Sequence, residues 1–271
     1  MTKNYVYRDV LIALLTGLSF FPDLHEAKAS FSGNPGSGEP EFVILSVYDN
    51  YSVDNKLQTA WGFSCLVKTP QRNVLFDTGG DADKLLYNMK QMGIDPYLID
   101  DIVISHIHSD HRGGLIGFLD CYHDVTVHIP ASFPDAVEKA IIQTGAGCER
   151  VSKGKKVCDH VYLTGEVQGS PSEQALVIES AKGLVVITGC AHPGIVQMVK
   201  TARKVAANDQ VFLVVGGFHR PPVSVVSAFR NLGVKKVAPS HCTGEQAIEA
   251  FKSEYQEDFI SFGVGQILKI Q

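Results

Sequence analysis

Residues 102–114 read IVISHIHSDHRGG, in which an apolar strand runs directly into four side chains that can bind a metal. His106 and His108 are two residues apart, so in extended backbone they point the same way and can hold one ion. Asp110 and His111 follow where the chain turns, and would face a neighbouring position that can hold a second ion. Polar side chains packed this densely beside a buried strand need hydrogen-bond or metal partners. The pattern therefore predicts a metal centre.

A metal centre of this kind needs further ligands from distant parts of the chain. His192 ends the stretch LVVITGCAH, residues 184–192, and His241 ends VAPSH, residues 237–241. Each histidine leaves an apolar strand and enters a turn that contains glycine. A single loop histidine would not indicate a metal site. Because the main cluster is present as well, we predict that both histidines bind metal.

The order of the expected strands and helices predicts the fold. Runs of strand-forming residues open each half of the chain, and strands that alternate with helices follow in both halves. The expected strands include 42–48, 61–68, 73–77 and 101–105, then 160–167, 175–179, 184–188, 211–215 and 259–268. This order favours two sheets packed face to face with helices outside them, a four-layer αββα sandwich of the α/β (α+β) class, over a doubly wound parallel sheet.

Five motifs resemble the metallo-β-lactamase superfamily. The signature His-x-His-x-Asp-His of that family matches His106, His108, Asp110 and His111 position by position. The motifs are LFDTG (75–79), SHIHSDHRGG (105–114), TGCAHPGI (188–195), GGFH (216–219) and SHCTG (240–244). Together they are most similar to the subgroup named for 7,8-dihydropterin-6-methyl-4-(ribofuranosyl)aminobenzene-5′-phosphate synthase, over about residues 42–270.

The resemblance implies roles for residues outside the main cluster. It makes His192 the third ligand of the first metal site and His241 the last ligand of the second. It gives Asp77 a hydrogen bond that fixes a ligand, although an aspartate that starts a turn is an equal alternative. Many family members also carry a bridging aspartate where this chain has Gly216-Gly217-Phe218-His219. One metal or two therefore remain possible, and His219 is a ligand, a proton donor or a substrate contact.

The expected function is metal-dependent hydrolysis of a small ester, lactone or phosphoester by a metal-bound hydroxide. One or two Zn²⁺ ions would lower the pKa of the water, with Mn²⁺ or Fe²⁺ as alternatives. Asp110 would bind metal and orient the water, and His219 would be the general acid. Arg220 or Arg112 would bind an anionic substrate, unless they are ordinary surface residues.

Other functions stay open beside hydrolysis. The resemblance implies a synthase that forms a carbon–nitrogen bond, and the missing bridging aspartate leaves room for a metal-bearing binding protein without turnover. Hydrolysis of β-lactams is a weaker alternative. Cys190 and Cys242 flank the predicted ligands His192 and His241, and are either small packing residues or sulfur ligands.

The composition is that of an ordinary globular protein with a sizeable core, and the expected partner of its metal site is a small molecule. Apolar residues make up 45% of the chain and charged residues 20%, with a net charge of -5. No long basic run is present in the sequence, so nucleic acid is not an expected partner.

The N-terminal region predicts export to the periplasm or secretion. Lys3 and Arg8 precede an apolar run over residues 10–21, and small residues favour cleavage before Ser30. Residues 1–29 would then be a signal peptide, 30–41 a linker and 42–271 a single catalytic domain, with no membrane span after cleavage. In an oxidising compartment Cys148 and Cys158 could form a disulfide.

Overall fold

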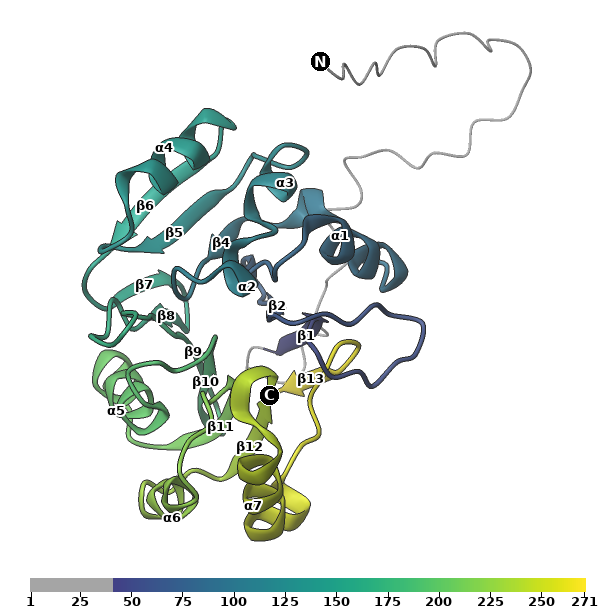
Figure 1. Cartoon of the computed structure of the whole chain (residues 1–271). Helices are drawn as coiled ribbons and strands as arrows, with labels where there is room; N and C mark the ends of the chain where they lie inside the picture. The colour runs from purple at the N-terminus through teal and green to yellow at the C-terminus, as the bar shows by residue number, and fades with distance from the viewer. Residues whose placement is uncertain (1–40) are drawn as a thin grey trace, which may run out of the picture. The chain divides into compact units, whose positions relative to one another are not determined.

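The computed structural model describes residues 41–271, and its centre consists of two β-sheets (Figure 1). The first sheet has the strand order β13-β1-β2-β3-β4-β5-β6. Its strands are β1 (Phe42–Tyr48), β2 (Ser64–Lys68), β3 (Asn73–Phe76), β4 (Asp101–Val103), β5 (Thr126–Pro130), β6 (Gly147–Val151) and β13 (Ile267–Ile270). The second sheet has the order β12-β11-β10-β9-β8-β7. Its strands are β7 (Lys155–Cys158), β8 (Val161–Leu163), β9 (Leu176–Ser180), β10 (Gly183–Thr188), β11 (Val211–Gly217) and β12 (Lys236–Ser240).

Helices cover the outer faces of both sheets. The α-helices are α1 (Ala82–Gln91), α2 (Ser109–Arg112), α3 (Leu115–Leu119), α4 (Asp135–Gln143), α5 (Ile195–Ala206), α6 (Ser224–Asn231) and α7 (Glu245–Tyr255). The 3₁₀ turns are η2 (Pro96–Leu98), η3 (His241–Thr243) and η4 (Gln256–Asp258). In Figure 1, α1, α3 and α4 lie with the first sheet, and α5, α6 and α7 with the second.

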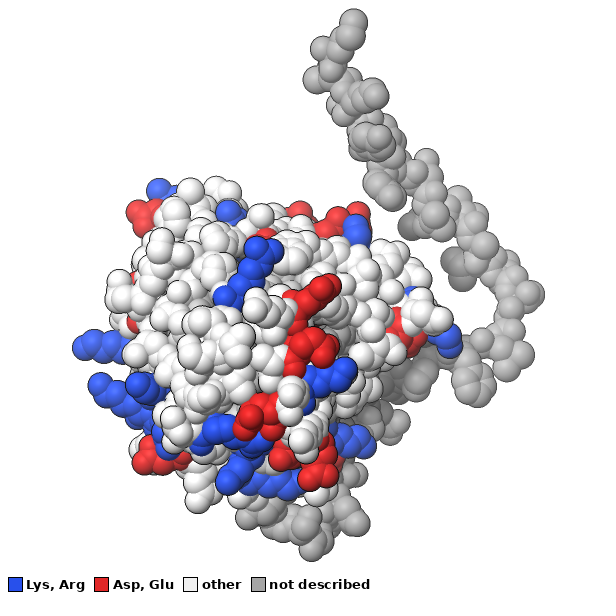
Figure 2. Space-filling model, turned by 60° about the horizontal axis from the view of Figure 1, so that its bottom comes forward, with Lys and Arg blue, Asp and Glu red and all other residues white. Residues whose placement is uncertain are grey.

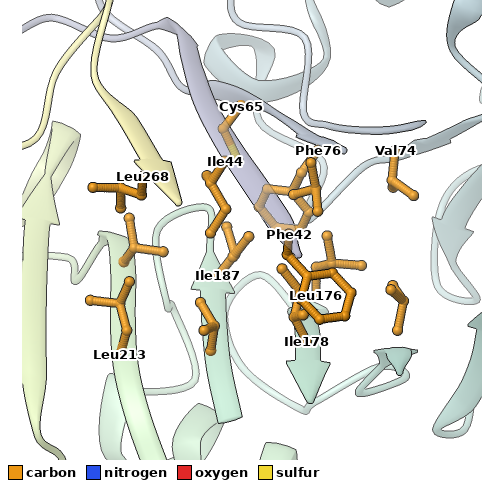
Figure 3. Close-up of a cluster of buried hydrophobic side chains, with 14 of the residues drawn as sticks. Phe42, Ile44, Cys65, Val74, Phe76, Leu176, Ile178, Ile187, Leu213 and Leu268 are labelled. Carbon is orange, nitrogen blue, oxygen red and sulfur yellow. The ribbon is translucent and has the colours of Figure 1, made fainter. Parts of the chain in front are cut away.

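The alternation of side chains along β1 shows how the layers form. Phe42 and Ile44 belong to the apolar cluster between the two sheets, which also contains Ile178 and Leu213 of the second sheet (Figure 3). Val43, one residue along, belongs instead to the cluster under α1 and α3. A third cluster packs α5, α6 and α7 on the second sheet. The structure therefore confirms the predicted αββα sandwich.

Parallel pairing brings the ends of several strands to common edges. In the first sheet β3, β4 and β5 run parallel, and in the second β10, β11 and β12 do so. Chain segments that follow parallel strands leave the sheet at the same edge. The segments after β3, β4, β10, β11 and β12 contain all the predicted metal ligands, so this topology gathers residues that are far apart in the sequence.

Three expected elements differ from the structure. The strand expected over 160–167 is only β8, because Gly165 takes a left-handed conformation (φ 69°) directly afterwards. The closing strand expected over 259–268 is β13, preceded by Gly265 at φ 94°. The strand expected over 61–68 is β2, which begins only at Ser64.

The disulfide left open for Cys148 and Cys158 is not formed in the structure. Cys148 lies on β6 of the first sheet and Cys158 on β7 of the second, and both are free thiols. Because the chain crosses from one sheet to the other between these strands, closeness in sequence does not bring the two sulfur atoms together.

The N-terminal predictions fall outside the described residues. This applies to the segment 1–29 and to the linker 30–41, apart from Glu41. From residue 41 onward, no helix combines the length and the apolar character that crossing a bilayer requires. On the face of the molecule shown in Figure 2, basic and acidic side chains are intermixed around large uncharged areas.

Candidate metal centre

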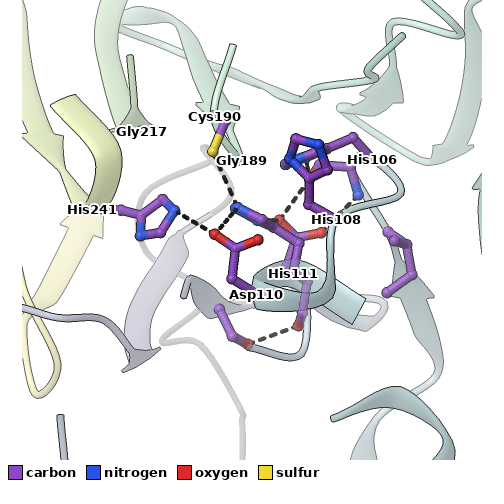
Figure 4. A network of polar contacts seen from close by, with 12 residues as sticks. His106, His108, Asp110, His111, Gly189, Cys190, Gly217 and His241 are labelled. Carbon is purple, nitrogen blue, oxygen red and sulfur yellow. Dashed lines mark hydrogen bonds and ion pairs between the residues drawn. The ribbon is translucent and has the colours of Figure 1, made fainter. Parts of the chain in front are cut away.

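The predicted ligands form two adjacent sets. His106, His108 and His192 offer nitrogen atoms that all lie within 4.8 Å of one another. A second set consists of Asp110, His111, His241 and one residue that was not favoured as a ligand, Cys190, with the same spacing. Figure 4 shows His106, His108, Asp110, His111, Cys190 and His241 converging on one region. The structure thus brings together all six residues predicted to bind metal.

Tight backbone packing determines the shape of the main cluster. After β4 the chain bends through His106 to the one-turn helix α2, which carries Asp110 and His111. Gly113 and Gly114 follow α2, and the backbone of residues 78–80 passes very close to both of them. A Cβ on Gly113 would lie 2.5 Å from the carbonyl oxygen of Gly80, and one on Gly114 would lie 2.4 Å from that of Thr78. Larger residues in the HRGG sequence would push the helix, and hence its ligands, away from β3.

Asp77 connects the end of β3 to the metal cluster. Its side chain is fully buried and accepts hydrogen bonds from the Ser105 backbone N–H and hydroxyl, both at 2.7 Å. Its Oδ2 also lies 2.7 Å from Nδ1 of His111. A carboxylate on Nδ1 favours the tautomer whose Nε2 is free to bind metal. The contacts of Asp77 are therefore those of a residue that orients a ligand, rather than those of a simple turn residue.

Two other histidines are oriented in the same manner. Nδ1 of His106 lies 2.9 Å from the Ser105 hydroxyl, which itself donates to Asp77. Nδ1 of His241 lies 2.9 Å from the side-chain oxygen of Asn50. In each case the remaining nitrogen, Nε2, is left for the centre of the site.

Sequence analysis missed Glu173, a fully buried carboxylate before β9. It accepts hydrogen bonds from four consecutive backbone N–H groups, those of residues 189–192, at 2.9–3.1 Å. The carboxylate therefore holds the loop that carries both Cys190 and His192. No local motif marks Glu173, because its partners are backbone groups of a distant loop. Asn50 is likewise not marked by any local motif, because the ring of its partner His241 is far away in the sequence.

Charges divide the site into two parts. Burial and the neighbouring histidines lower the pKa of His106 well below its ordinary value, and burial with His219 and His108 lowers that of His192 to about 4. Although burial opposes it, Asp77 raises the pKa of His111 to about 9. Burial acts to raise the pKa of Asp110. The contacts with His241 and His111 outweigh burial and hold that pKa below its usual range. The Asp110–His111 side of the site therefore stabilises a positive charge, whereas the side of His106 and His192 disfavours one.

The donor atoms fit a divalent metal. Nε2 of His192 and of His241 are buried and have no hydrogen-bond partner in the part of the chain that is described. The His241 nitrogen lies 3.3 Å from Oδ2 of Asp110, but the two atoms do not form a hydrogen bond. Buried polar atoms normally have partners. Imidazole, carboxylate and thiol groups that converge in this way satisfy a transition metal or zinc.

The remaining predicted residues lie at the rim. His219 is exposed, and its ring centroid is 4.1 Å from that of His192. Burial, His108 and Arg220 lower the pKa of His219, so the neutral ring is favoured near pH 7. Arg112 donates from Nε to the carbonyl oxygen of Ile107 at 2.7 Å, and so supports the loop of the main cluster.

A cavity of about 460 Å³ opens beside the second set of ligands. Trp61, Tyr51, Arg220 and His241 line it, together with the beginning of α7. The indole of Trp61 is 56% exposed and lies 4.8 Å from the ring of His241, measured between centroids. A hollow of about 580 Å³ between α1 and η2 contains none of the predicted ligands.

Comparison with known sequences identifies related proteins. The profile of the metallo-beta-lactamase superfamily matches residues 62–142. The 7,8-dihydropterin-6-methyl-4-(beta-D-ribofuranosyl)-aminobenzene-5′-phosphate synthase of Methanocaldococcus jannaschii is 31% identical over 252 residues, which cover 73% of this chain and 85% of that protein. This agrees with the family resemblance of the sequence motifs.

Solved structures give the same relationship. The crystal structure of Tm1679, described as a metal-dependent hydrolase of the beta-lactamase superfamily, is 29% identical with a TM-score of 0.70, and the match covers 84% of this chain and 98% of that one. The metallo-beta-lactamase fold protein YhfI from Bacillus subtilis is 12% identical with a TM-score of 0.62, covering 85% and 99%. At that identity YhfI supports the fold alone.

The predicted export of the chain is wrong. A relative that is 31% identical over 73% of this chain is a synthase of an archaeon, which points away from a periplasmic or secreted protein. The prediction rested on a short apolar run after two basic residues, over positions that the structure does not describe. A run of that length is also found in buried or amphipathic segments, so it was weak evidence for export.

Proposed function

Because the chain belongs to the metallo-β-lactamase superfamily, we propose that it is a divalent-metal-dependent hydrolase of a small, anionic ester, lactone or phosphoester. Residues 42–271 would form the catalytic domain. The observation that carries the proposal is the pair of adjacent ligand sets beside a cavity that also contains an arginine.

We assign His106, His108 and His192 to one metal position, and Asp110, His111 and His241 to the other. Zn²⁺ is the first choice because imidazole nitrogens dominate both sets, while Mn²⁺ and Fe²⁺ share part of this ligand preference. A bound ion of this kind supplies an activated water and polarises a carbonyl or phosphoryl oxygen.

The protein's own residues supply orientation and proton handling. Asp77, Ser105 and Asn50 fix the ring orientations of His111, His106 and His241 through contacts of 2.7–2.9 Å at Nδ1. Asp110 stays ionised, so its carboxylate can both bind an ion and accept a hydrogen bond from water. His219 lies beside His192 and favours the neutral imidazole, which suits hydrogen-bond donation to a leaving group better than storage of a proton.

The cavity supports an anionic substrate with a flat apolar part. Arg220 lies at its wall and can form a bidentate contact with a carboxylate or phosphate. Trp61 and Tyr51 offer aromatic faces at the same opening. Arg112, whose Nε is occupied by a backbone contact, is less available for this role.

A second candidate is a synthase that forms a carbon–nitrogen bond. The 31% identity to the dihydropterin synthase of M. jannaschii favours it. The aromatic and cationic lining of the cavity is compatible with a ring-containing phosphate substrate, so the two candidates differ in reaction rather than in the kind of molecule bound.

The proposal is tested by metal content and turnover measured on the same preparations. We would compare the full chain, the variant Asp110→Ala and the control His123→Ala, which removes an exposed histidine outside the ligand sets. Metal per chain would be determined by plasma emission spectroscopy. Turnover would be measured with phosphoesters and lactones, and separately with the reactants of the named synthase.

We expect the native chain and His123→Ala to hold close to two ions and to hydrolyse at least one compound of the panel. Asp110→Ala should hold about one ion fewer and lose about 10²-fold or more of its turnover, as for removal of a group that contacts the reacting atoms. Turnover with the synthase reactants alone would replace hydrolysis by the second candidate. Metal binding without either reaction would reject both activities.

A further inference from the structure

Cys190 occupies a central position between the two ligand sets. Its side chain is buried, and its Sγ lies 3.2 Å from Nε2 of His111. The same sulfur atom lies within 4.8 Å of donor atoms of Asp110 and His241 on one side, and of His192 and His219 on the other. Figure 4 shows the thiol pointing at His111 from the segment after β10.

The end of β11 explains why a sulfur atom lies here. This strand ends at Gly217, and a Cβ at that position would lie 2.2 Å from the carbonyl oxygen of Gly189 and 2.7 Å from Sγ of Cys242. It would also lie 3.2 Å from Cα of Cys190. A side chain at position 217 therefore cannot enter the site, because the segment of Cys190 already fills that space.

Cys190 is held in place independently of any metal. Its backbone N–H donates to Oε1 of the buried Glu173 at 3.0 Å, and the neighbouring N–H groups donate to the same carboxylate. The thiol therefore faces the site because of the loop conformation. A second observation points to a ligand: Nε2 of His241, on a side chain with 0% exposure, faces the same set and lacks a hydrogen-bond partner among residues 41–271.

We propose that the thiolate of Cys190 is a ligand of the metal ion held by Asp110, His111 and His241, and replaces a carboxylate from the end of β11. The assignment rests on the metal centre of the proposed function. As the metal–sulfur bond forms, the S–H bond breaks and its proton passes to solvent, with no change in oxidation state. Thiolate, imidazole and carboxylate together favour Zn²⁺ or Co²⁺ over the hard cations Mg²⁺ and Ca²⁺.

Cobalt provides a test that does not depend on turnover. The metal-free full chain would be titrated with Co²⁺, with absorbance recorded in the near ultraviolet, where a cobalt–thiolate bond gives a charge-transfer band. The variants are Cys190→Ser and the matched control Cys242→Ser. The Cys242 thiol is also buried and lies 3.8 Å from the carbonyl oxygen of Cys190, but it belongs to neither ligand set.

We expect the band in the native chain and in Cys242→Ser, and its loss in Cys190→Ser with a fall of at least about tenfold in affinity at this position. If Cys190→Ser does not fold, the native and Cys242→Ser spectra still decide the question, since both must show the band. Cobalt binding without a band, or a band lost only in Cys242→Ser, would overturn the assignment and leave the metal centre intact. Failure of the native chain to bind cobalt would reject the metal centre as well.

Discussion

A single carboxylate, Asp77, sets the orientation of two histidines, His106 and His111, at opposite ends of the HIHSDH segment (106–111). It contacts His111 directly and His106 through the hydroxyl of Ser105. Its own backbone has φ 57°, a conformation that aspartate and asparagine tolerate better than most residues. Aspartate at this position therefore satisfies both the turn after β3 and the hydrogen bonding of the ligands.

The substitution Asp77→Asn tests this orienting role. Asparagine keeps the size and the tolerated backbone conformation, but it offers one acceptor oxygen where Asp77 receives three contacts. We expect the affinity for Zn²⁺ to fall about 10–100-fold, measured by competition with a chelator of known affinity. The exposed Asp159→Asn is the control. Equal zinc affinity in Asp77→Asn and the native chain would mean that Asp77 serves the turn alone.

Glu173→Gln tests the second buried carboxylate at the same scale. Glutamine replaces one of the two carboxylate oxygens by an NH2 group, which cannot accept, so at least one of the four backbone N–H groups that now donate to Glu173 would lose its acceptor. We expect a loss of about 1–3 kcal/mol in the free energy of unfolding, read from urea denaturation of the metal-free protein. Glu249→Gln, at an exposed position of α7, should leave stability nearly unchanged. A midpoint that does not move for Glu173→Gln would show that the loop holds its shape without the carboxylate.

At the scale of the elements, sequence predicts what depends on neighbouring residues and misses what depends on tertiary contacts. The strands before His106, His192 and His241 are evident from apolar runs, and the positions of these histidines at strand ends predict that they form one metal centre. Glu173 and the favourable position of Cys190 are invisible in the sequence, because both depend on how the loop after β10 packs. The sequence predicts too long a strand where a glycine in a left-handed conformation, such as Gly165, interrupts an otherwise β-rich run.

Asp101, the first residue of β4, contacts Arg72, which precedes β3, and His128 of β5. Oδ2 of Asp101 lies 2.6 Å from Nη1 of Arg72, and Oδ1 lies 2.9 Å from Nε2 of His128. Burial acts to raise the pKa of Asp101, but His128 and Arg72 outweigh it and lower that pKa. A carboxyl group whose pKa is lowered by folding stabilises the protein above its unfolded pKa of about 3.9. That contribution is lost as the pH falls through the lower, folded value.

We therefore expect Asp101→Asn to lose about 1–3 kcal/mol of unfolding free energy at pH 7. Below about pH 4 the difference from the native chain should shrink, since Asp101 of the unfolded native chain then binds a proton, and it is lost once the pH falls below the lowered pKa of the folded state. Urea denaturation of both metal-free proteins at pH 7, 5 and 3 measures this. In Asp159→Asn, which alters an exposed pair with Lys156, solvent screening should leave little difference at any pH. A deficit in Asp101→Asn that is independent of pH would contradict the ionic role.

Across the whole molecule, the site joins the two sheets. His106, His108, Asp110 and His111 follow β4 of the first sheet, whereas Cys190, His192 and His241 follow β10 and β12 of the second. Neither set of ligands is complete within one sheet. An ion bound there can be held only when both halves of the sandwich are in place, so metal binding and folding are thermodynamically linked.

This linkage predicts a rise in the unfolding temperature with zinc. At a free concentration 100 times the dissociation constant, a ligand of the folded state adds about 2.7 kcal/mol, which for a domain of this size corresponds to roughly 5–10 °C. Differential scanning calorimetry of the chelator-treated chain, with and without Zn²⁺, measures the rise. His192→Ala and His241→Ala should each lose much of it, while His123→Ala keeps it. Ca²⁺ should not substitute, because it binds oxygen rather than imidazole. An equal rise with Ca²⁺, or with zinc in both ligand variants, would place the bound ion outside this centre.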